Sequence, residues 1–246
     1  MKLVSSAFGV FALLAAFVSG STMLRQEAEG VVAALSPAPT TTIEFTGTTT
    51  FGTAKWDGPL VLLTGSSLTV KGSGTLDGQG SWYWKQGTSI SRPVFFRMNK
   101  VLSSTVSGFT LKNMPYRTFS ILSSQKTTIS GLTLDASAGD DLAKNTDGFD
   151  LSGNDYVTIK GNKIYNQDDC LAMQSSTNTV FSNNYCSGGH GISIGSLGGS
   201  TVTSSDTVSG LTVSGNSIVN SVNGIRIKTI IGLKGLVSNV KYSDNK

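Results

Sequence analysis

A six-residue phrase recurs along this chain, with an apolar residue first, glycine or asparagine near its centre and a further apolar or aromatic position at its end. Its copies occupy residues 106–111, 129–134, 159–164, 181–186, 208–213 and 237–242, and an earlier copy starts at Val70. The first residues of successive copies lie 23, 30, 22, 27 and 29 positions apart. A repeat of this length is typical of solenoids, propellers and other stacked arrays.

The length of the repeat selects among these architectures. Propeller blades need about 40 residues or more, and leucine-rich repeats need ladders of leucine, so neither fits. An antiparallel β-sandwich would show hairpin turns between neighbouring strands, whereas here similar segments recur at a nearly constant offset. Only 14% of the residues are charged, which disfavours a bundle of amphipathic helices. We therefore predict a right-handed parallel β-helix whose coils contain two to four short strands.

The N-terminus carries the pattern of a secretory signal peptide. Lys2 is followed by an almost wholly apolar run over residues 3–18, and the small residues Ser19 and Gly20 follow. We expect residues 1–20 to be removed, residues 21–44 to form a short leader and residues 45–246 to form the β-helix. The mature chain contains no other long apolar run, so we expect a secreted protein that does not interact with membranes.

The cysteine count and the net charge limit the cross-links, metals and binding partners that we expect. Cys170 and Cys186 form an even pair in a chain expected to be secreted, which suggests one disulfide bond. Two cysteines and one histidine are too few for a structural zinc site. The formal net charge of +4 is not gathered into a basic stripe, so nucleic acid is not an expected partner.

The repeat also predicts which polar residues meet. Asp147 precedes Ile159 by 12 residues and Asp169 precedes Phe181 by 12, while Arg226 precedes Val237 by 11. Positions at the same phase of successive coils lie above one another. We expect a single cleft that crosses four coils and contains Asp147, Asp168, Asp169, His190, Arg226 and Lys228.

Three carboxylates in one cleft suit acid–base chemistry. Mutual repulsion raises the pKa of one carboxyl, which can then act as an acid, while the others stay ionised and orient a water molecule. Asp168 and Asp169 can both enter the cleft only at a bend, because neighbours on a regular strand point to opposite faces. A solvated pair of aspartates at a turn is the competing interpretation.

The remaining polar residues have competing interpretations too. His190 is a lone histidine between two glycines that leave room for a ligand. Arg226 and Lys228 share one strand face and could bind the carboxylates of a sugar-acid polymer or form a structural ion-pair network. Ser193 stands in a G-x-S-x-G match, but no helix is expected after it, so we interpret it as a strand residue and not as a nucleophile.

Four motifs together resemble the polygalacturonases of glycoside hydrolase family 28, of the secreted fungal endo-acting type. They are Asn145-Thr-Asp147-Gly-Phe-Asp150, Gln167-Asp168-Asp169-Cys170, Gly189-His190-Gly191 and Arg226-Ile-Lys228. The resemblance covers roughly residues 45 to 246. It implies a β-helix that hydrolyses α-1,4-galacturonosyl linkages of demethylated pectin with inversion, acts as a monomer and needs neither a metal nor another cofactor.

The resemblance also implies roles for single residues. Asp168 matches the general acid, Asp147 and Asp169 match the pair that activates water, and His190 matches the histidine of the catalytic site. Arg226 and Lys228 match cations that bind the substrate, and Asn145 belongs to the same substrate site. The family pattern pairs the cysteines that match Cys170 and Cys186.

Two departures from the family keep other functions open. Members of the family continue for several coils beyond the Arg-Ile-Lys motif, and a tyrosine of those coils lines the substrate site. They also begin with a cysteine-bearing cap. This sequence contains neither the further coils nor the cap, so we expect a shortened form. One alternative is a catalytically inactive protein that binds pectin. Another is a pectate lyase, whose aspartates would hold Ca²⁺ while an arginine abstracts a proton.

Overall fold

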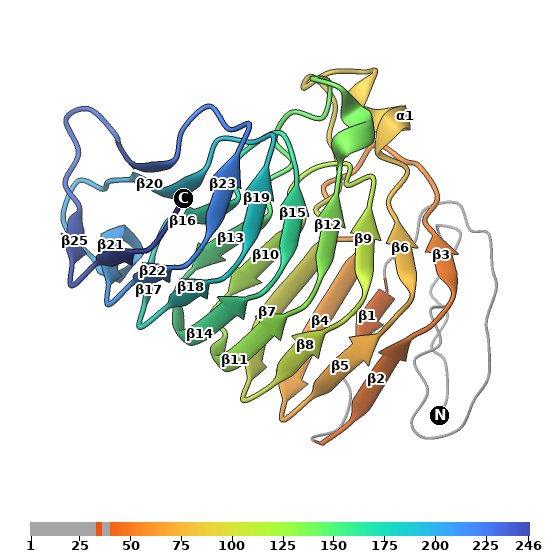
Figure 1. Cartoon of the computed structure of the whole chain (residues 1–246), viewed down its shortest axis with the longest axis horizontal. Coiled ribbons are helices and arrows are strands. Elements are labelled where there is room, and N and C mark those ends of the chain that lie inside the picture. The colour runs from red at the N-terminus through yellow and green to blue at the C-terminus, as the bar shows by residue number, and fades with distance from the viewer. Residues whose placement is uncertain (1–32, 36–39) are drawn as a thin grey trace.

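The chain winds into a right-handed parallel β-helix, as the repeat predicts. The computed structural model describes residues 33–35 and 40–246. Short strands stack coil upon coil along the long axis, from the N-terminal coils at one end to β24–β26 at the other (Figure 1). Every pairing between named strands is parallel.

Two sheets form the wall of the helix. The smaller has seven strands: β3 (Thr48–Thr50), β6 (Thr75–Asp77), β9 (Thr110–Lys112), β12 (Thr133–Asp135), β15 (Lys163–Tyr165), β19 (Tyr185–Ser187) and β23 (Ser217–Val219). The larger sheet has 19 strands and curves around the rest of the coil.

The larger sheet divides into stacks of strands at equivalent positions in successive coils. One stack is β1 (Ala33–Leu35), β4 (Val61–Ser66), β7 (Phe96–Leu102), β10 (Phe119–Leu122), β13 (Phe149–Ser152), β16 (Leu171–Met173), β20 (Ile192–Leu197) and β24 (Ile225–Thr229). Another contains β2 (Thr42–Phe45), β5 (Thr69–Gly72), β8 (Thr105–Ser107), β11 (Gln125–Ser130), β14 (Asn154–Lys160), β18 (Val180–Ser182), β22 (Thr212–Ser214) and β26 (Lys241–Ser243). A short third stack is β17 (Ser176–Thr177), β21 (Thr207–Ser209) and β25 (Leu236–Ser238).

Helical segments are few among the described residues. They are α1 (Gly80–Trp84) and the 3₁₀ turns η1 (Ser137–Gly139) and η2 (Ser204–Asp206). α1 and η1 lie side by side at one edge of the stack, where Trp84 approaches Gly139 (Figure 1). None of the described helices is long and apolar enough to cross a membrane.

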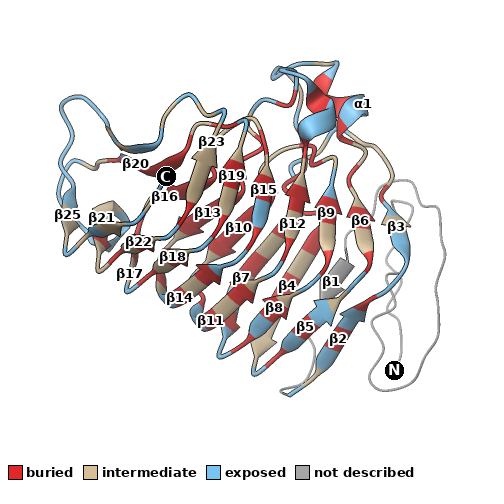
Figure 2. Cartoon of the chain, viewed as in Figure 1, coloured by how far each residue is buried: buried red, intermediate tan, exposed pale blue. Residues whose placement is uncertain are grey.

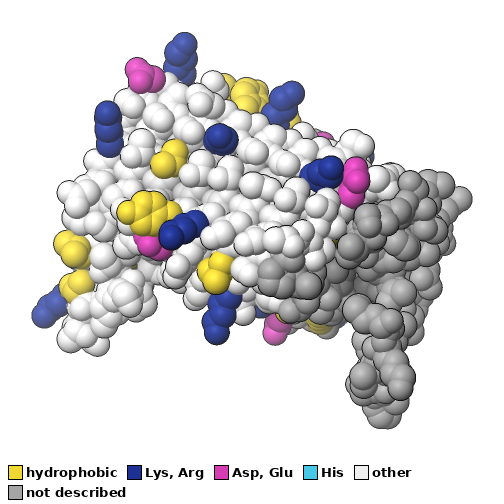
Figure 3. All heavy atoms as spheres, turned by 90° about the horizontal axis from the view of Figure 1, so that it is seen from below, with side chains coloured by type: hydrophobic (Ala, Val, Ile, Leu, Met, Phe, Trp, Pro, Cys, Tyr) yellow, Lys and Arg dark blue, Asp and Glu magenta, His cyan; other side chains and the backbone are white. Residues whose placement is uncertain are grey.

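The interior of the helix is filled by apolar ladders, which Figure 2 shows as buried stripes along the strands. Phe96, Phe119 and Phe149 are in register on β7, β10 and β13, and all three are fully buried. Their ring centroids lie 5.1 and 5.2 Å apart. The Phe119 and Phe149 rings are stacked and the Phe96 ring is tilted against Phe119, so ring contacts add to the burial of apolar area. The outer face seen in Figure 3 is mostly uncharged, and its charged and apolar side chains are scattered.

A ladder of asparagines closes the turn between the two sheets. Asn162, Asn184 and Asn216 are buried, and each side-chain oxygen accepts hydrogen bonds from the coil before it. The Asn184 amide nitrogen in turn donates to the Ile159 carbonyl at 3.1 Å. The asparagine side chains thereby supply hydrogen-bond partners to buried backbone groups that the sheets do not pair at this turn.

The repeat alignment is correct for five copies and wrong for the last two. Val70, Val106, Ile129, Ile159 and Phe181 are in register, as predicted. The phrases that begin at residues 208 and 237 instead lie on β21 and β25, in register with the short strand β17. The true equivalents of Phe181 are at positions 213 and 242. Similar Val-Ser-containing phrases occur on two successive strands of one coil, which is why the phrase alone misassigned them.

The β-helix also begins earlier than expected. The predicted boundary at residue 45 falls on the last residue of β2, and Ile43 of that strand is in register with Val70. β1 pairs with β4 further upstream, within the segment interpreted as a leader. The expected signal peptide at residues 1–20 lies outside the described residues.

Candidate active site

Two neighbouring columns of residues form the site on the stack that contains β10, β13, β16, β20 and β24. Phe149, Leu171 and Ile192 are in register, and two residues before each of them stand Asp147, Asp169 and His190. The predicted alignment of Asp147 with Asp169 is therefore confirmed, and His190 stands in the same column.

Arg226 stands in the second column, contrary to the prediction. It is in register with Ser193, Ala172 and Asp150, and Asn223 holds the position equivalent to Asp169. The error follows from the misassigned phrase at Val237. Arg226 nevertheless joins the site, because its long side chain reaches back across the columns to Asp169.

Asp169 is the most enclosed member of the site. Its side chain is fully buried, and its Oδ1 accepts hydrogen bonds from Ser193 Oγ at 2.6 Å and from Arg226 Nη2 at 2.6 Å. Lys228 Nζ donates to Oδ2 of the same carboxylate. Two cations and a hydroxyl therefore fix the orientation of this carboxylate, and charged partners compensate for its burial.

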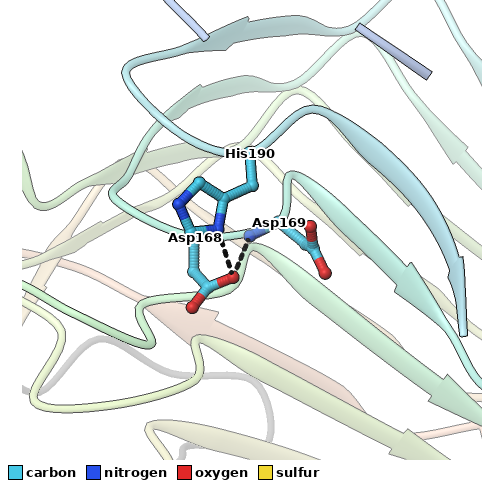
Figure 4. A group of neighbouring side chains, drawn as sticks. All are labelled: Asp168, Asp169 and His190. Atoms are coloured by element: carbon cyan, nitrogen blue, oxygen red, sulfur yellow. Dashed lines mark hydrogen bonds and ion pairs between the residues drawn. The ribbon is translucent and has the colours of Figure 1, made fainter. Parts of the chain in front are cut away.

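Asp168 faces a different environment, although it is the next residue along the chain. The backbone bends at Asp168, as the sequence predicts for a pair that must enter one cleft. Its Oδ1 lies 3.0 Å from His190 Nδ1, and its Oδ2 accepts a hydrogen bond of 3.2 Å from Asn145. Figure 4 shows the Asp168 and His190 side chains facing each other while the Asp169 carboxylate turns away. The Asp168 side chain is 17% exposed, so it can meet a ligand.

Asp147 is buried and accepts no hydrogen bond from any described side chain. It is 8% exposed, and its pKa is raised well above that of an ordinary aspartate. Burial is the main cause, and repulsion from Asp150, Asp168 and Asp169 adds to it, while Arg117 acts in the opposite direction. One carboxyl in the cleft therefore has a raised pKa, but the main cause at Asp147 is burial and not the expected repulsion.

Asp150 is a fourth carboxyl of the site that sequence reasoning did not single out. It is buried, and burial raises its pKa to about 7, partly offset by the Arg117 guanidinium. The nearest cationic atom is Arg117 Nε, at 3.7 Å from Asp150 Oδ2. The signal was available, because Asp150 ends the first motif and lies three residues after Asp147.

Arg92 holds the Asn145 side chain of the site in place, and sequence reasoning did not predict this residue either. Its guanidinium is buried and donates to the Lys144 carbonyl at 2.7 Å and to Asn145 Oδ1 at 2.8 Å. Because Arg92 occupies the oxygen of the Asn145 amide, the nitrogen of that amide is left to face Asp168. No periodic signal marks Arg92, since it lies in a loop before β7.

The expected disulfide bond joins Cys170 to Cys186. Cys170 follows the Asp168–Asp169 pair directly, and Cys186 lies on β19 of the smaller sheet. The bond therefore ties the bend that carries both carboxylates to the smaller-sheet strand of the next coil.

Asp168, Asp169 and His190 could in principle bind a cation, because one ligand atom from each lies within 4.8 Å of the others. Their present contacts do not favour this use. Both oxygens of Asp169 already face the positive charges of Arg226 and Lys228. A cation at the same carboxylate would be repelled by these two side chains.

Comparison with known proteins places the chain in a family. The family model described as glycosyl hydrolases family 28 matches residues 26–246. This chain belongs to that family.

The curated relatives include a polygalacturonase of Penicillium expansum and endopolygalacturonase B of Aspergillus oryzae. The first is 45% identical to this chain over 213 residues, and the second is 45% identical over 209 residues. Both alignments cover 83% of this chain but 56% of the relative, so the chain spans little more than half the length of these proteins.

Two solved structures share the fold of this chain. Endopolygalacturonase I from Stereum purpureum, complexed with two galacturonates, superposes with a TM-score of 0.75 at 34% identity. The alignment covers 88% of this chain and 66% of that one. An endo-xylogalacturonan hydrolase from Aspergillus tubingensis superposes with a TM-score of 0.76 at 29% identity, covering 88% of this chain and 65% of that one.

Proposed function

We propose that this protein hydrolyses α-1,4-galacturonosyl linkages of polygalacturonate, the demethylated form of pectin, in the interior of the polymer. The observation that carries the proposal is the division of labour between two adjacent aspartates. Asp168 lies at the open side of the site with His190, whereas Asp169 is buried against two cations. The similarity to endopolygalacturonases supports the substrate class.

Asp168 donates the proton in the proposed reaction. It is partly exposed and is oriented by His190 and Asn145, so its carboxyl can reach the oxygen of a scissile linkage. General acids of this kind contribute about 10²- to 10⁴-fold to a rate.

Asp147 and Asp169 orient the attacking water, and the Asp169 carboxylate accepts its proton. The two stand at equivalent positions of neighbouring coils, so one water molecule can lie between their carboxyl groups and the sugar ring. The Asp169 carboxylate forms ion pairs with Arg226 and Lys228. Attack by this water on the face opposite to the departing oxygen inverts the anomeric centre.

Arg226 and Lys228 also bind a galacturonate carboxylate. Their side chains are each 28% exposed, so donors remain available after the contacts with Asp169 are made. Ser193 is the strand residue that the sequence suggests, not a nucleophile. It is fully buried on β20, donates to Asp169 and accepts from Arg226 Nε at 2.8 Å.

We also propose that the protein is secreted and acts as a monomer on the polysaccharide. The apolar run after Lys2 and the disulfide bond between Cys170 and Cys186 support an oxidising, extracellular setting.

Release of reducing ends from polygalacturonate tests the proposal. We expect the full chain to release them in the presence of a chelator, and Asp168→Asn to lose at least about 100-fold of this activity. Asp141→Asn is the matched control: Asp141 is an exposed residue of the loop between β12 and β13, one coil before Asp168, with a left-handed backbone that asparagine tolerates. Proton NMR of fresh product should show the β-anomer.

The alternatives predict different outcomes. A lyase would release unsaturated products and lose activity with the chelator; the occupation of Asp169 by two cations disfavours it. An inactive pectin-binding protein would bind polygalacturonate without releasing reducing ends. Equal activity of the wild type and Asp168→Asn would contradict the assignment of the acid.

A further inference from the structure

Arg117 stands at the edge of the site opposite to Arg226 and Lys228. It lies two residues before Phe119, which is in register with Phe149, so it occupies the coil position directly before Asp147 in the first column. The backbone supports this register, because Thr118 N–H donates to the Asp147 carbonyl at 2.8 Å. The column therefore reads Arg117, Asp147, Asp169 and His190 across four successive coils.

The Arg117 guanidinium packs against an aromatic ring, but its N–H groups have no hydrogen-bond acceptor among the described residues. Its guanidinium lies over the Tyr116 ring at 5.2 Å, and the Arg92 guanidinium lies over the same ring at 4.9 Å. Its Nε is buried and has no hydrogen-bond partner, because Asp150 Oδ2 at 3.7 Å is too distant for a hydrogen bond. None of the hydrogen bonds among described residues uses an Arg117 donor, although the side chain is 38% exposed. Arg226, by contrast, donates to both Ser193 and Asp169.

We propose that Arg117 binds a carboxylate of the polysaccharide and forms an additional anionic-sugar subsite on the N-terminal side of the catalytic carboxyls. A planar guanidinium with free donors matches a carboxylate in a bidentate manner. The cleft then has a cation at each end, so a chain of sugar acids is held by its carboxylates on both sides of the reacting linkage. This inference rests on the proposed substrate class, and it adds a residue that the sequence motifs do not contain.

The electrostatics of the cleft support the assignment. Burial acts to lower the pKa of Arg117, but the surrounding groups, chiefly Asp150, outweigh it and raise the pKa. Asp147 and Asp168 contribute in the same direction. Asp150 is largely protonated below its pKa of about 7 and then leaves the positive charge of Arg117 uncompensated.

Binding measured without turnover tests the subsite. The full chain carrying Asp168→Asn is titrated calorimetrically with hexagalacturonate and with its fully methyl-esterified form. Adding Arg117→Gln should weaken binding of the acid about tenfold, the equivalent of about 1.4 kcal/mol. It should leave binding of the ester unchanged, and Arg117→Lys should restore part of the affinity. Lys160→Gln, at an exposed lysine of β14, is the control and should not alter either affinity.

A purely supportive role for Arg117 would give different results. If Arg117 only neutralises Asp150, the effect of Arg117→Gln should vanish when Asp150→Asn is also present; a persistent tenfold loss supports direct binding. Equal affinity for the acid with and without Arg117, or an equal loss for the acid and the ester, would overturn the subsite. Hydrolysis by the wild type is measured separately, so a failure of the catalytic proposal is distinguishable from a failure of the subsite.

Discussion

At the scale of single residues, the site places four carboxyls under different constraints. Asp169 is neutralised by Arg226 and Lys228, and Asp168 is oriented by His190 and Asn145. Asp150 lacks a hydrogen-bond partner at Oδ2, although this atom is buried. Burying a carboxyl without such a partner costs free energy when the group is charged. The charged form of Asp150 therefore destabilises the fold.

The raised pKa of Asp150 predicts that Asp150→Asn stabilises the fold at high pH but not at low pH. The pKa is raised from 3.8 to about 7 on folding, so the folded state binds the proton more tightly and loses stability as the pH rises between these values. Asp150→Asn removes this loss, which amounts to at most about 4 kcal/mol. We expect the variant to have a higher Tm than the wild type at pH 8 and a similar Tm at pH 4. Calorimetry at both values checks this, and a gain that is larger at pH 4 would contradict it.

A second residue-scale prediction concerns Arg92. Replacing Arg92 by lysine keeps the charge but removes the fork that donates to both the Lys144 carbonyl and Asn145. The Asn145 amide is then free to rotate away from Asp168, so we expect kcat to fall about tenfold with little change in KM, and the acid limb of the pH profile to move. Asn145→Ser in the Arg92→Lys background should add little. A change confined to Tm, with an unchanged pH profile, would show that Arg92 only supports the loop.

At the scale of elements, the ladder of asparagines stabilises each coil against the next. Asn184 bonds to Asn162, Asn216 and the Ile159 carbonyl, all of them buried. Asn184→Ala leaves several of these groups unpaired, so we expect a loss of about 2–4 kcal/mol in the free energy of unfolding. Asn183→Gly is the matched control: Asn183 is exposed, and its φ of 54° suits glycine. Urea unfolding of both variants checks the prediction, and similar losses would contradict it.

The elements also show what the sequence could and could not predict. Apolar residues at a fixed offset predicted the stacked strands and the alignment of Asp147 with Asp169, because one register holds through these coils. The position of Arg226 was wrong because a loop over residues 230–235 lengthens its coil and phrases of similar sequence occur on two strands. Arg117 precedes Asp147 by 30 residues, the same spacing as Ile129 and Ile159, so the repeat could have revealed it. The Arg92 contacts depend on loop geometry, which no periodic pattern records.

At the scale of the whole molecule, the cleft runs across coils that contact only their neighbours. Arg117 and Arg226 lie at its two ends. The strands along the cleft are β10, β13, β16, β20 and β24. In a solenoid, stability is roughly a sum over coils and their interfaces, so a ligand that bridges several coils stabilises them jointly. A single sugar can reach only one end of the cleft, whereas a chain of sugar acids can reach both.

This geometry predicts length-dependent stabilisation by the ligand. We expect hexagalacturonate at about 100 times its Kd to stabilise the Asp168→Asn chain by about 2.7 kcal/mol and to raise its Tm accordingly. Galacturonate at the same total carboxylate concentration should raise the Tm much less, because it cannot connect the two cationic ends. The shift should shrink as salt rises, since the contacts at Arg117, Arg226 and Lys228 are partly exposed and therefore screened. Maltohexaose has the same number of sugars without carboxylates and should leave the Tm unchanged. A shift equal for the monomer and the hexamer would mean that the ligand contacts one coil and that the two ends do not act on one chain.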